Sequence, residues 1–258
     1  MKLNQDILSS IYGTIDNLEE KCISSKQCWE HFSQFKLKDS QYTYLPYVGA
    51  EYKNILFCGI NLNGGNNELN AINILVDGAI NDLKNKKYKI FKQKGYGGSS
   101  FYYYVPLISF LFKKYFIDNV QFHNETNISW EEKIEGYKYC ALTNIVKCSV
   151  NSNDKRSTPN NKMLLNCIPK FIEELKYFEY KVLFFFTYFK YPTLTDTYFS
   201  HFKVIKNSDR YRIKSCEGKW IVELEHPLST RITRIKKFNE YKSAVYELCN
   251  SMKSNNLL

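Results

Sequence analysis

Two polar residues stand directly after apolar runs of the kind that form buried strands. Asn61 ends the stretch K-N-I-L-F-C-G-I-N, and His226 follows the apolar run of residues 220–225. A side-chain amide can hold and orient a water molecule. An imidazole can donate a hydrogen bond to an oxygen on which negative charge develops during a reaction. The two residues together suit a hydrolysis in which an anionic group departs.

A third polar residue, Asn144, lies late in another apolar run, C-A-L-T-N-I-V. Strands alternate with helices along the chain, which predicts an α/β fold with a parallel sheet and helices on both faces. Ligands of such sheets bind outside the carboxyl ends of the strands. We therefore expect Asn61, Asn144 and His226 to face one crevice.

The elements that would position these residues follow from hydrophobic periodicity and from the length of each apolar run. Continuous apolar runs predict strands that are buried on both faces. The expected strands are 54–60, 139–146, 181–187 and 220–225, and the expected helices are 5–35, 71–83, 101–116, 162–177 and 239–252. We expect a single domain over residues 1–258, with an N-terminal helical extension over about 1–45 and a long loop and helix insertion over about 63–100.

The chain is basic: its 258 residues include 36 Lys and Arg against 26 Asp and Glu, for a formal charge of +10. This excess favours DNA as a partner, because phosphate contacts release counterions. A general bias towards Lys and Asn would produce the same excess. No run approaches the roughly 18 apolar residues of a membrane span, and the first residues lack the apolar stretch of a signal peptide. We expect a cytoplasmic monomer with no membrane partner and with reduced cysteines.

Three short motifs, in this order, resemble motifs of the uracil-DNA glycosylase superfamily. Residues 59–61, G-I-N, are similar to the water-positioning G-I-N-P-G motif of the mismatch-specific branch. Residues 143–148, T-N-I-V-K-C, are similar to the T-N-V-V-K-C segment of the iron–sulfur branch. Residues 226–229, H-P-L-S, resemble the H-P-S motif that carries the catalytic histidine of the family. The resemblance covers roughly residues 50–250.

The resemblance implies a three-layer α/β/α sandwich around a central, mainly parallel four-stranded sheet, and a DNA glycosylase as the activity. Such an enzyme extrudes a pyrimidine from the stack and hydrolyses its N-glycosidic bond, which leaves an abasic site. Asn61 would orient the water, His226 would stabilise the departing base, and Asn144 would read its Watson–Crick edge. The amide of Asn144 suits uracil in one orientation and a cytosine-type base in the other. Phe101 or Tyr102 would stack on the base.

The basic segment after His226 is expected to contact DNA. Leu228 or Ile232 would insert into the vacated base stack as a wedge. An ordinary basic start of a helix is the alternative interpretation. The expected phosphate contacts are Ser229, Arg231, Arg234, Lys236 and Lys237.

The sequence departs from the family pattern around the base pocket. Leu62 stands where the family usually has Pro, the segment 63–100 is long, and the serine after His226 comes one residue late. These differences bear on the substrate more than on the reaction class. Uracil is the usual substrate of the family. The alternatives are removal of a bulky modified cytosine, such as glucosylated hydroxymethylcytosine of phage DNA, in antiviral defence; a DNA-binding relative without activity; and an enzyme that acts on free nucleosides.

The chemistry itself requires no cofactor and no metal. The iron–sulfur branch holds a structural [4Fe–4S] cluster on four cysteines, and Cys22, Cys28, Cys148 and Cys167 occupy similar places in this chain. The spacing differs, because the first pair is C-x5-C rather than C-x2-C. The chain has eight cysteines in all, and the others suit small hydrophobic positions.

Overall fold

A computed structural model describes residues 45–61, 71–85, 99–121, 128–147, 161–186, 194–227 and 234–255, together with Ile7, Ser10 and Ile11. The described chain is a mixed α/β protein, as the alternation of strands and helices predicts. Ile7, Ser10 and Ile11 are helical, and the rest of the expected helix 5–35 lies outside the described residues.

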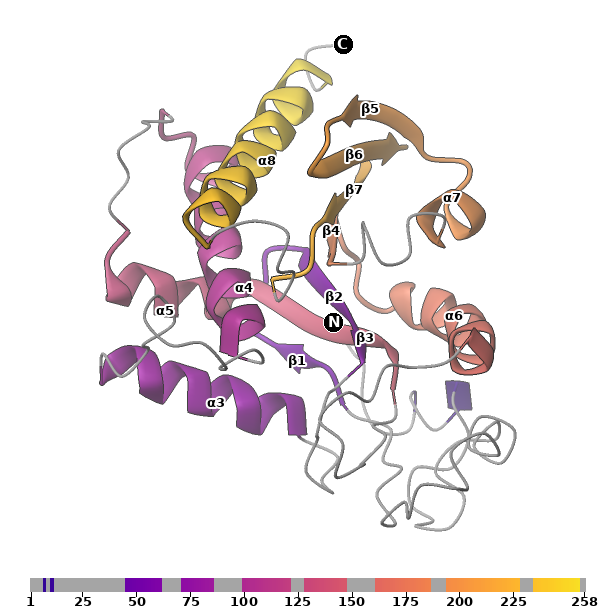
Figure 1. The fold of residues 1–258 in the computed structure, drawn as a ribbon, viewed down its shortest axis with the longest axis horizontal. Helices are drawn as coiled ribbons and strands as arrows, with labels where there is room; N and C mark the ends of the chain where they lie inside the picture. The colour runs from indigo at the N-terminus through magenta and orange to yellow at the C-terminus, as the bar shows by residue number, and fades with distance from the viewer. Residues whose placement is uncertain are drawn as a thin grey trace. The chain divides into compact units, whose positions relative to one another are not determined.

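The described strands form one seven-stranded sheet in the order β1-β3-β2-β4-β7-β6-β5 (Figure 1). The four expected strands are adjacent in this order, and they are β2 (Ile55–Asn61), β3 (Cys140–Val146), β4 (Val182–Phe185) and β7 (Lys219–Leu224). The sheet is larger than the four strands expected, because β1 (Tyr47–Val48), β5 (Lys203–Asn207) and β6 (Tyr211–Cys216) extend it at its ends. β4 and β7 pair in parallel, whereas β5, β6 and β7 form antiparallel pairs.

The observed helices include most of those that the hydrophobic periodicity predicts. They are α3 (Ala71–Lys84), α4 (Ser99–Phe112), the short π-helix η2 (Lys113–Ile117), α5 (Trp130–Tyr139), α6 (Asn161–Leu175), α7 (Leu194–Tyr198) and α8 (Arg234–Asn255). α3, α4, α6 and α8 correspond to expected helices. In the part of the chain that the structure describes, no helix combines the length and the apolar character that a bilayer span requires.

The chain divides into two compact units. Unit 1 comprises residues 1–47, 58–75 and 142–179. Unit 2 comprises residues 48–57, 76–141 and 180–258. The strands β2 and β3 each contribute residues to both units.

The central strands are buried along their length, as their apolar sequences predict. Residues 55–58 of β2 have no exposed surface, and every residue of β3 and of β4 is buried. In unit 2, the ring of Phe57 stacks on Phe184 at 4.8 Å between centroids and on Phe186 at 6.1 Å. Packing of this kind buries large apolar surfaces, which is the main source of stability in such a core.

Strands β5 and β6 are not among the strands expected from the sequence. All residues of β5 are exposed, so the strand lacks the apolar run by which the central strands are recognised. The turn from β6 to β7, in contrast, has a recognisable sequence. Glu217 and Gly218 have φ angles of 47° and 78°, which a two-residue type I′ turn requires. Gly218 is the local signal for this turn, because glycine adopts a positive φ without strain.

Helix α5 is not among the helices expected from the sequence. A capping box begins the helix: the Ser129 hydroxyl accepts a hydrogen bond from the Glu132 amide at 3.1 Å. The Glu132 carboxylate accepts one from the Ser129 amide at 2.8 Å. The S-W-E-E sequence is the recognisable signature of such a start.

A missing hydrogen bond in α4 is replaced by a side chain of α5. Pro106 lies inside α4 and has no N–H to donate to the carbonyl of Tyr102. The Tyr137 hydroxyl of α5 donates a hydrogen bond to that carbonyl. Gly136 allows the approach, because a Cβ at this position would lie 1.8 Å from the carbonyl oxygen of Pro106. The pair Gly136-Tyr137 therefore sets the distance between the two helices.

We expect Gly136→Ala to lower the free energy of unfolding by about 1–3 kcal/mol, because the backbone of α4 must move to admit the methyl group. Urea unfolding measures the change. Gly78→Ala in α3 is the matched control, since no atom lies within 4 Å of a Cβ there. The control should be neutral or stabilising by up to about 1 kcal/mol. Equal responses of the two variants would contradict this account of the α4–α5 contact.

Candidate functional site

Asn144 lies within β3 in unit 1, and 7% of its surface is exposed. An amide side chain offers one acceptor and two donors. Asn144 can therefore bind a ligand that supplies a donor and an acceptor.

The neighbours of Asn144 in the T-N-I-V-K motif have a structural role. Thr143 and Lys147 have the same parity along the strand and so share one face, while Asn144 lies on the opposite face. The Thr143 hydroxyl donates a hydrogen bond to Glu174 Oε1 of α6 at 2.8 Å. Lys147 Nζ lies 2.6 Å from the same oxygen and also donates to the Thr143 hydroxyl. This buried network attaches β3 to α6 on one face and leaves Asn144 on the other.

Cys58 of β2 lies near this network and behaves as an apolar residue. Its side chain is fully buried, and its thiol donates a hydrogen bond to the Gly59 carbonyl at 3.2 Å. Burial raises the pKa of the Cys58 thiol well above its ordinary value, although the charge of Lys147 acts in the opposite direction. A thiol that stays protonated is neither a nucleophile nor a metal ligand.

His226 follows β7 in unit 2 and is half-buried. Side chains of α8 contact the main chain on both sides of it. The Tyr241 hydroxyl donates a hydrogen bond to the Glu225 carbonyl at 2.6 Å. Lys237 Nζ donates one to the Pro227 carbonyl at 2.7 Å. The histidine therefore stands between two anchored peptide groups.

Lys237, one of the expected phosphate contacts, is 3% exposed, and its ammonium group donates a hydrogen bond to a main-chain carbonyl. Spacing along α8 could have indicated this, because Lys237 and Tyr241 are four residues apart and share one face of the helix.

Strand β7 is anchored before His226 by a second buried network. Glu223 is fully buried and accepts hydrogen bonds from the Thr195 hydroxyl and from Arg212 of the neighbouring strand β6. The hydrogen bond with Glu223 is the main cause that raises the pKa of Arg212, so the guanidinium stays charged. Lys214 and Asp196 extend the network through a 2.6 Å ion pair. These contacts hold the register of β7, three residues before His226.

Phe101 and Tyr102, the expected stacking residues, lie in the first turn of α4 and are half-buried. The ring of Phe101 meets Phe186 edge to face at 5.2 Å. Phe186 in turn meets Tyr241 at 5.9 Å. A continuous series of contacts within unit 2 therefore joins Phe101 to the main chain beside His226. The carbonyl of Tyr102 is occupied by the bond from Tyr137, as described above.

The other expected site residues are placed only in part. Asn61 is the last residue of β2, and its side chain lies outside the described part of the chain. Arg234 and Lys236 belong to the first turn of α8, and their side chains also lie outside it. Leu228, Ser229, Arg231 and Ile232 lie outside the described residues.

The expected cluster ligands fall mostly outside the described residues, which include only Cys167 of the four. Cys167 is a buried residue of α6. Within the described ranges, no group of three or more His, Cys, Asp or Glu side chains could hold a metal ion. The iron–sulfur cluster stays a prediction, and no step of the chemistry depends on it.

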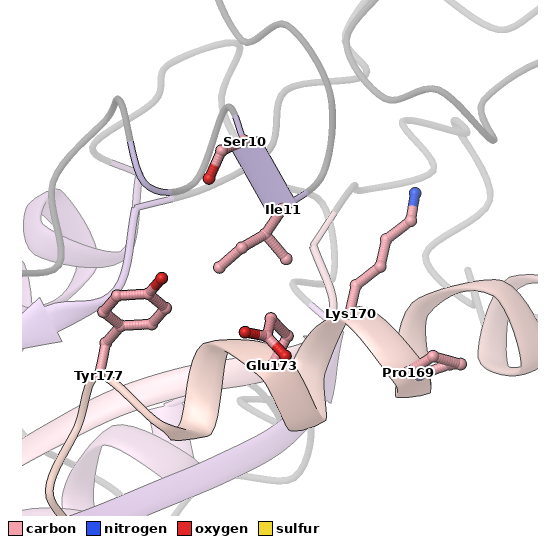
Figure 2. Close-up of a pocket in the computed structure, with 6 residues that line it drawn as sticks. All are labelled: Ser10, Ile11, Pro169, Lys170, Glu173 and Tyr177. Atoms are coloured by element: carbon pink, nitrogen blue, oxygen red, sulfur yellow. The ribbon is translucent and has the colours of Figure 1, made fainter.

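A surface hollow in unit 1 has a volume of about 410 Å³ and lies beside α6 (Figure 2). It is lined by Ser10, Ile11, Pro169, Lys170, Glu173 and Tyr177. None of the expected site residues lines this hollow.

No protein-family model and no curated protein sequence matches the chain.

We expect Lys147→Met to lower the free energy of unfolding by about 3–5 kcal/mol, because it leaves the buried Glu174 carboxylate without its cation. Adding Glu174→Leu to that variant should recover much of the loss. Lys176→Met is the matched control, since Lys176 forms an exposed ion pair with Glu173 and should contribute at most about 1 kcal/mol. Denaturant unfolding measures all three. A double variant no more stable than Lys147→Met would contradict the pairing.

Proposed function

We propose that this protein is a DNA glycosylase that hydrolyses the N-glycosidic bond of an extruded pyrimidine and leaves an abasic site. The observation that carries the proposal is the position of Asn144, a nearly buried residue on the face of β3 opposite the network of Thr143, Lys147 and Glu174. Because its neighbours in the motif are engaged in that network, Asn144 is the residue of the motif that we propose for recognition. The basic composition of the chain and the three motifs also support the proposal.

Recognition in this proposal begins with extrusion of the base, which costs a few kcal/mol. Asn144 pairs with the Watson–Crick edge of the base, and Phe101 stacks on its face. The Phe101 ring is half-buried and rests against Phe186, which suits a fixed platform. Stacking of a base on an aromatic ring contributes about 1–3 kcal/mol and tolerates different bases.

The chemical step breaks the bond between C1′ of the sugar and the ring nitrogen of the base. The bonding electron pair leaves with the base, and His226 donates a hydrogen bond to the base oxygen on which the charge develops. Asn61 orients a water molecule that adds to C1′. The water proton passes to the departed base, so the products are the free base and an abasic deoxyribose.

The charge of the transition state limits the rate of such an enzyme. A carboxylate in place of Asn61 would stabilise the sugar cation by roughly 4 kcal/mol at about 4 Å and an effective dielectric near 20. An amide lacks that contribution. We therefore expect slow turnover or a substrate with a good leaving group.

Two substrates fit the proposal. Uracil is one, and a bulky modified cytosine such as glucosylated hydroxymethylcytosine is the other. The long segment 63–100 and Leu62 in the motif loop favour a pocket with an altered shape. Excision of a phage-specific base would place the protein in antiviral defence.

DNA contacts beyond the base complete the proposal. Leu228 fills the gap in the stack. Ser229, Arg231, Arg234 and Lys236 bind phosphates. We further propose that helices cover both faces of a mainly parallel central sheet, in three layers, and that the enzyme acts as a cytoplasmic monomer.

We expect the purified protein to produce alkali-labile sites in end-labelled DNA that carries uracil, hydroxymethylcytosine or glucosylated hydroxymethylcytosine. Cleavage should occur at one of these bases. His226→Ala should reduce the rate by about 10²–10³-fold, because it removes the donor to the developing charge. Asn61→Ala and Asn144→Ala should also lose activity.

Matched controls are available within the chain. His201 is an exposed histidine that packs on Phe202 at 4.8 Å, and Asn85 is an exposed residue at the end of α3. His201→Ala and Asn85→Ala should retain full activity. DNA binding without cleavage of any of the three substrates would contradict the proposal for this panel and favour a binding protein.

A further inference from the structure

We propose that Lys237 and Tyr241 form a clamp that positions His226 for the departure of the base, a role that rests on the function proposed above. Both are positioning residues, because they bond to the main chain on either side of the histidine rather than to a substrate. The contacts lie wholly within unit 2. Figure 1 shows α8, which carries the clamp, alongside α4.

The end of strand β7 creates the need for such a clamp. The strand ends at Leu224, so the carbonyls of Glu225 and Pro227 have no place in the ladder of strand pairs. Buried carbonyl groups require partners. Tyr241 and Lys237, one helical turn apart on α8, supply one hydrogen bond to each. Side chains four residues apart on one face of α8 thus reach the two carbonyls on either side of His226.

Lysine is an unusual residue at a buried position such as 237. Lys237 is 3% exposed, and taking an ammonium group out of water is costly. A neutral side chain such as Met would fill the same volume without that cost, but it could not donate a hydrogen bond. The ammonium group of Lys237 therefore supplies a hydrogen bond to the Pro227 carbonyl that a Met side chain could not supply.

The other arm of the clamp is rigid. The Tyr241 ring meets Tyr104 at 5.0 Å and Phe186 at 5.9 Å, both edge to face. All three side chains are buried. Burial raises the pKa of the Tyr241 hydroxyl well above its ordinary value, so it remains a hydrogen-bond donor. The hydroxyl is thus held in place by packing and remains able to hold the Glu225 carbonyl.

Placement of this kind matters for a donor that acts on developing charge. Such donors work only within about 0.5 Å of the productive geometry. With the peptide groups on both sides held, the main chain of His226 is fixed in position. Loss of either anchor should therefore lower kcat while leaving KM nearly unchanged, because the interaction is made in the transition state.

The test uses the full chain labelled with ¹³C-histidine and the variants Lys237→Met and Tyr241→Phe. The chain has four histidines, so His226→Gln assigns the imidazole signals of His226. Both variants should shift or broaden these signals and leave those of His201 unchanged. Lys242→Met is the matched control, because Lys242 is another buried lysine of α8. Its His226 signals should match those of the native protein.

The rate of base excision from DNA is the second measurement. Each clamp variant should lose tenfold or more in kcat, whereas Lys242→Met should not. Unchanged His226 signals and unchanged kcat in both clamp variants would overturn the clamp. If Lys237→Met fails to fold, Tyr241→Phe decides alone, since it removes only one oxygen atom. Shifted His226 signals in both clamp variants, together with a native protein that excises no base, would support the clamp and contradict the proposed function.

Discussion

Buried charged side chains are the constraint on which the candidate site depends, because a buried charge needs a partner within the fold. In unit 1 this constraint joins Lys147 to Glu174, and in unit 2 it joins Arg212 to Glu223. One member of each ion pair lies three residues from a candidate functional side chain. The ion pairs therefore anchor β3 to α6 and β7 to β6 beside the places where recognition and chemistry are proposed.

Residues next to both candidate functional residues make the structural contacts. Thr143 and Lys147 are engaged with α6, and Asn144 points to the opposite face of β3. Glu225 and Pro227 are held through their carbonyls, and His226 stands between them. Rigid surroundings of this kind reduce the reorganisation that a reaction or a binding event would otherwise require.

The strands and helices were predictable where the local sequence shows which residues are buried. Continuous apolar runs predicted β2, β3, β4 and β7, and helical periodicity predicted α3, α4, α6 and α8. Strand β5 could not be predicted in this way, because it is exposed and is held by its pairing with β6 rather than by an apolar core. Two further elements did carry local signals, namely the Glu-Gly turn before β7 and the capping box before α5.

The sequence by itself determined that Asn61 ends a strand, that Asn144 lies within one and that His226 follows one, because strand formation depends on the apolar residues that precede each of them. Only the tertiary structure decided the roles of the lysines. Lys147 and Lys237 read as ordinary basic residues in their segments, yet both are buried. A lysine can be buried only where a distant part of the chain supplies an acceptor, and Glu174 and the Pro227 carbonyl come from other elements. That requirement is long-range, so no local pattern could express it.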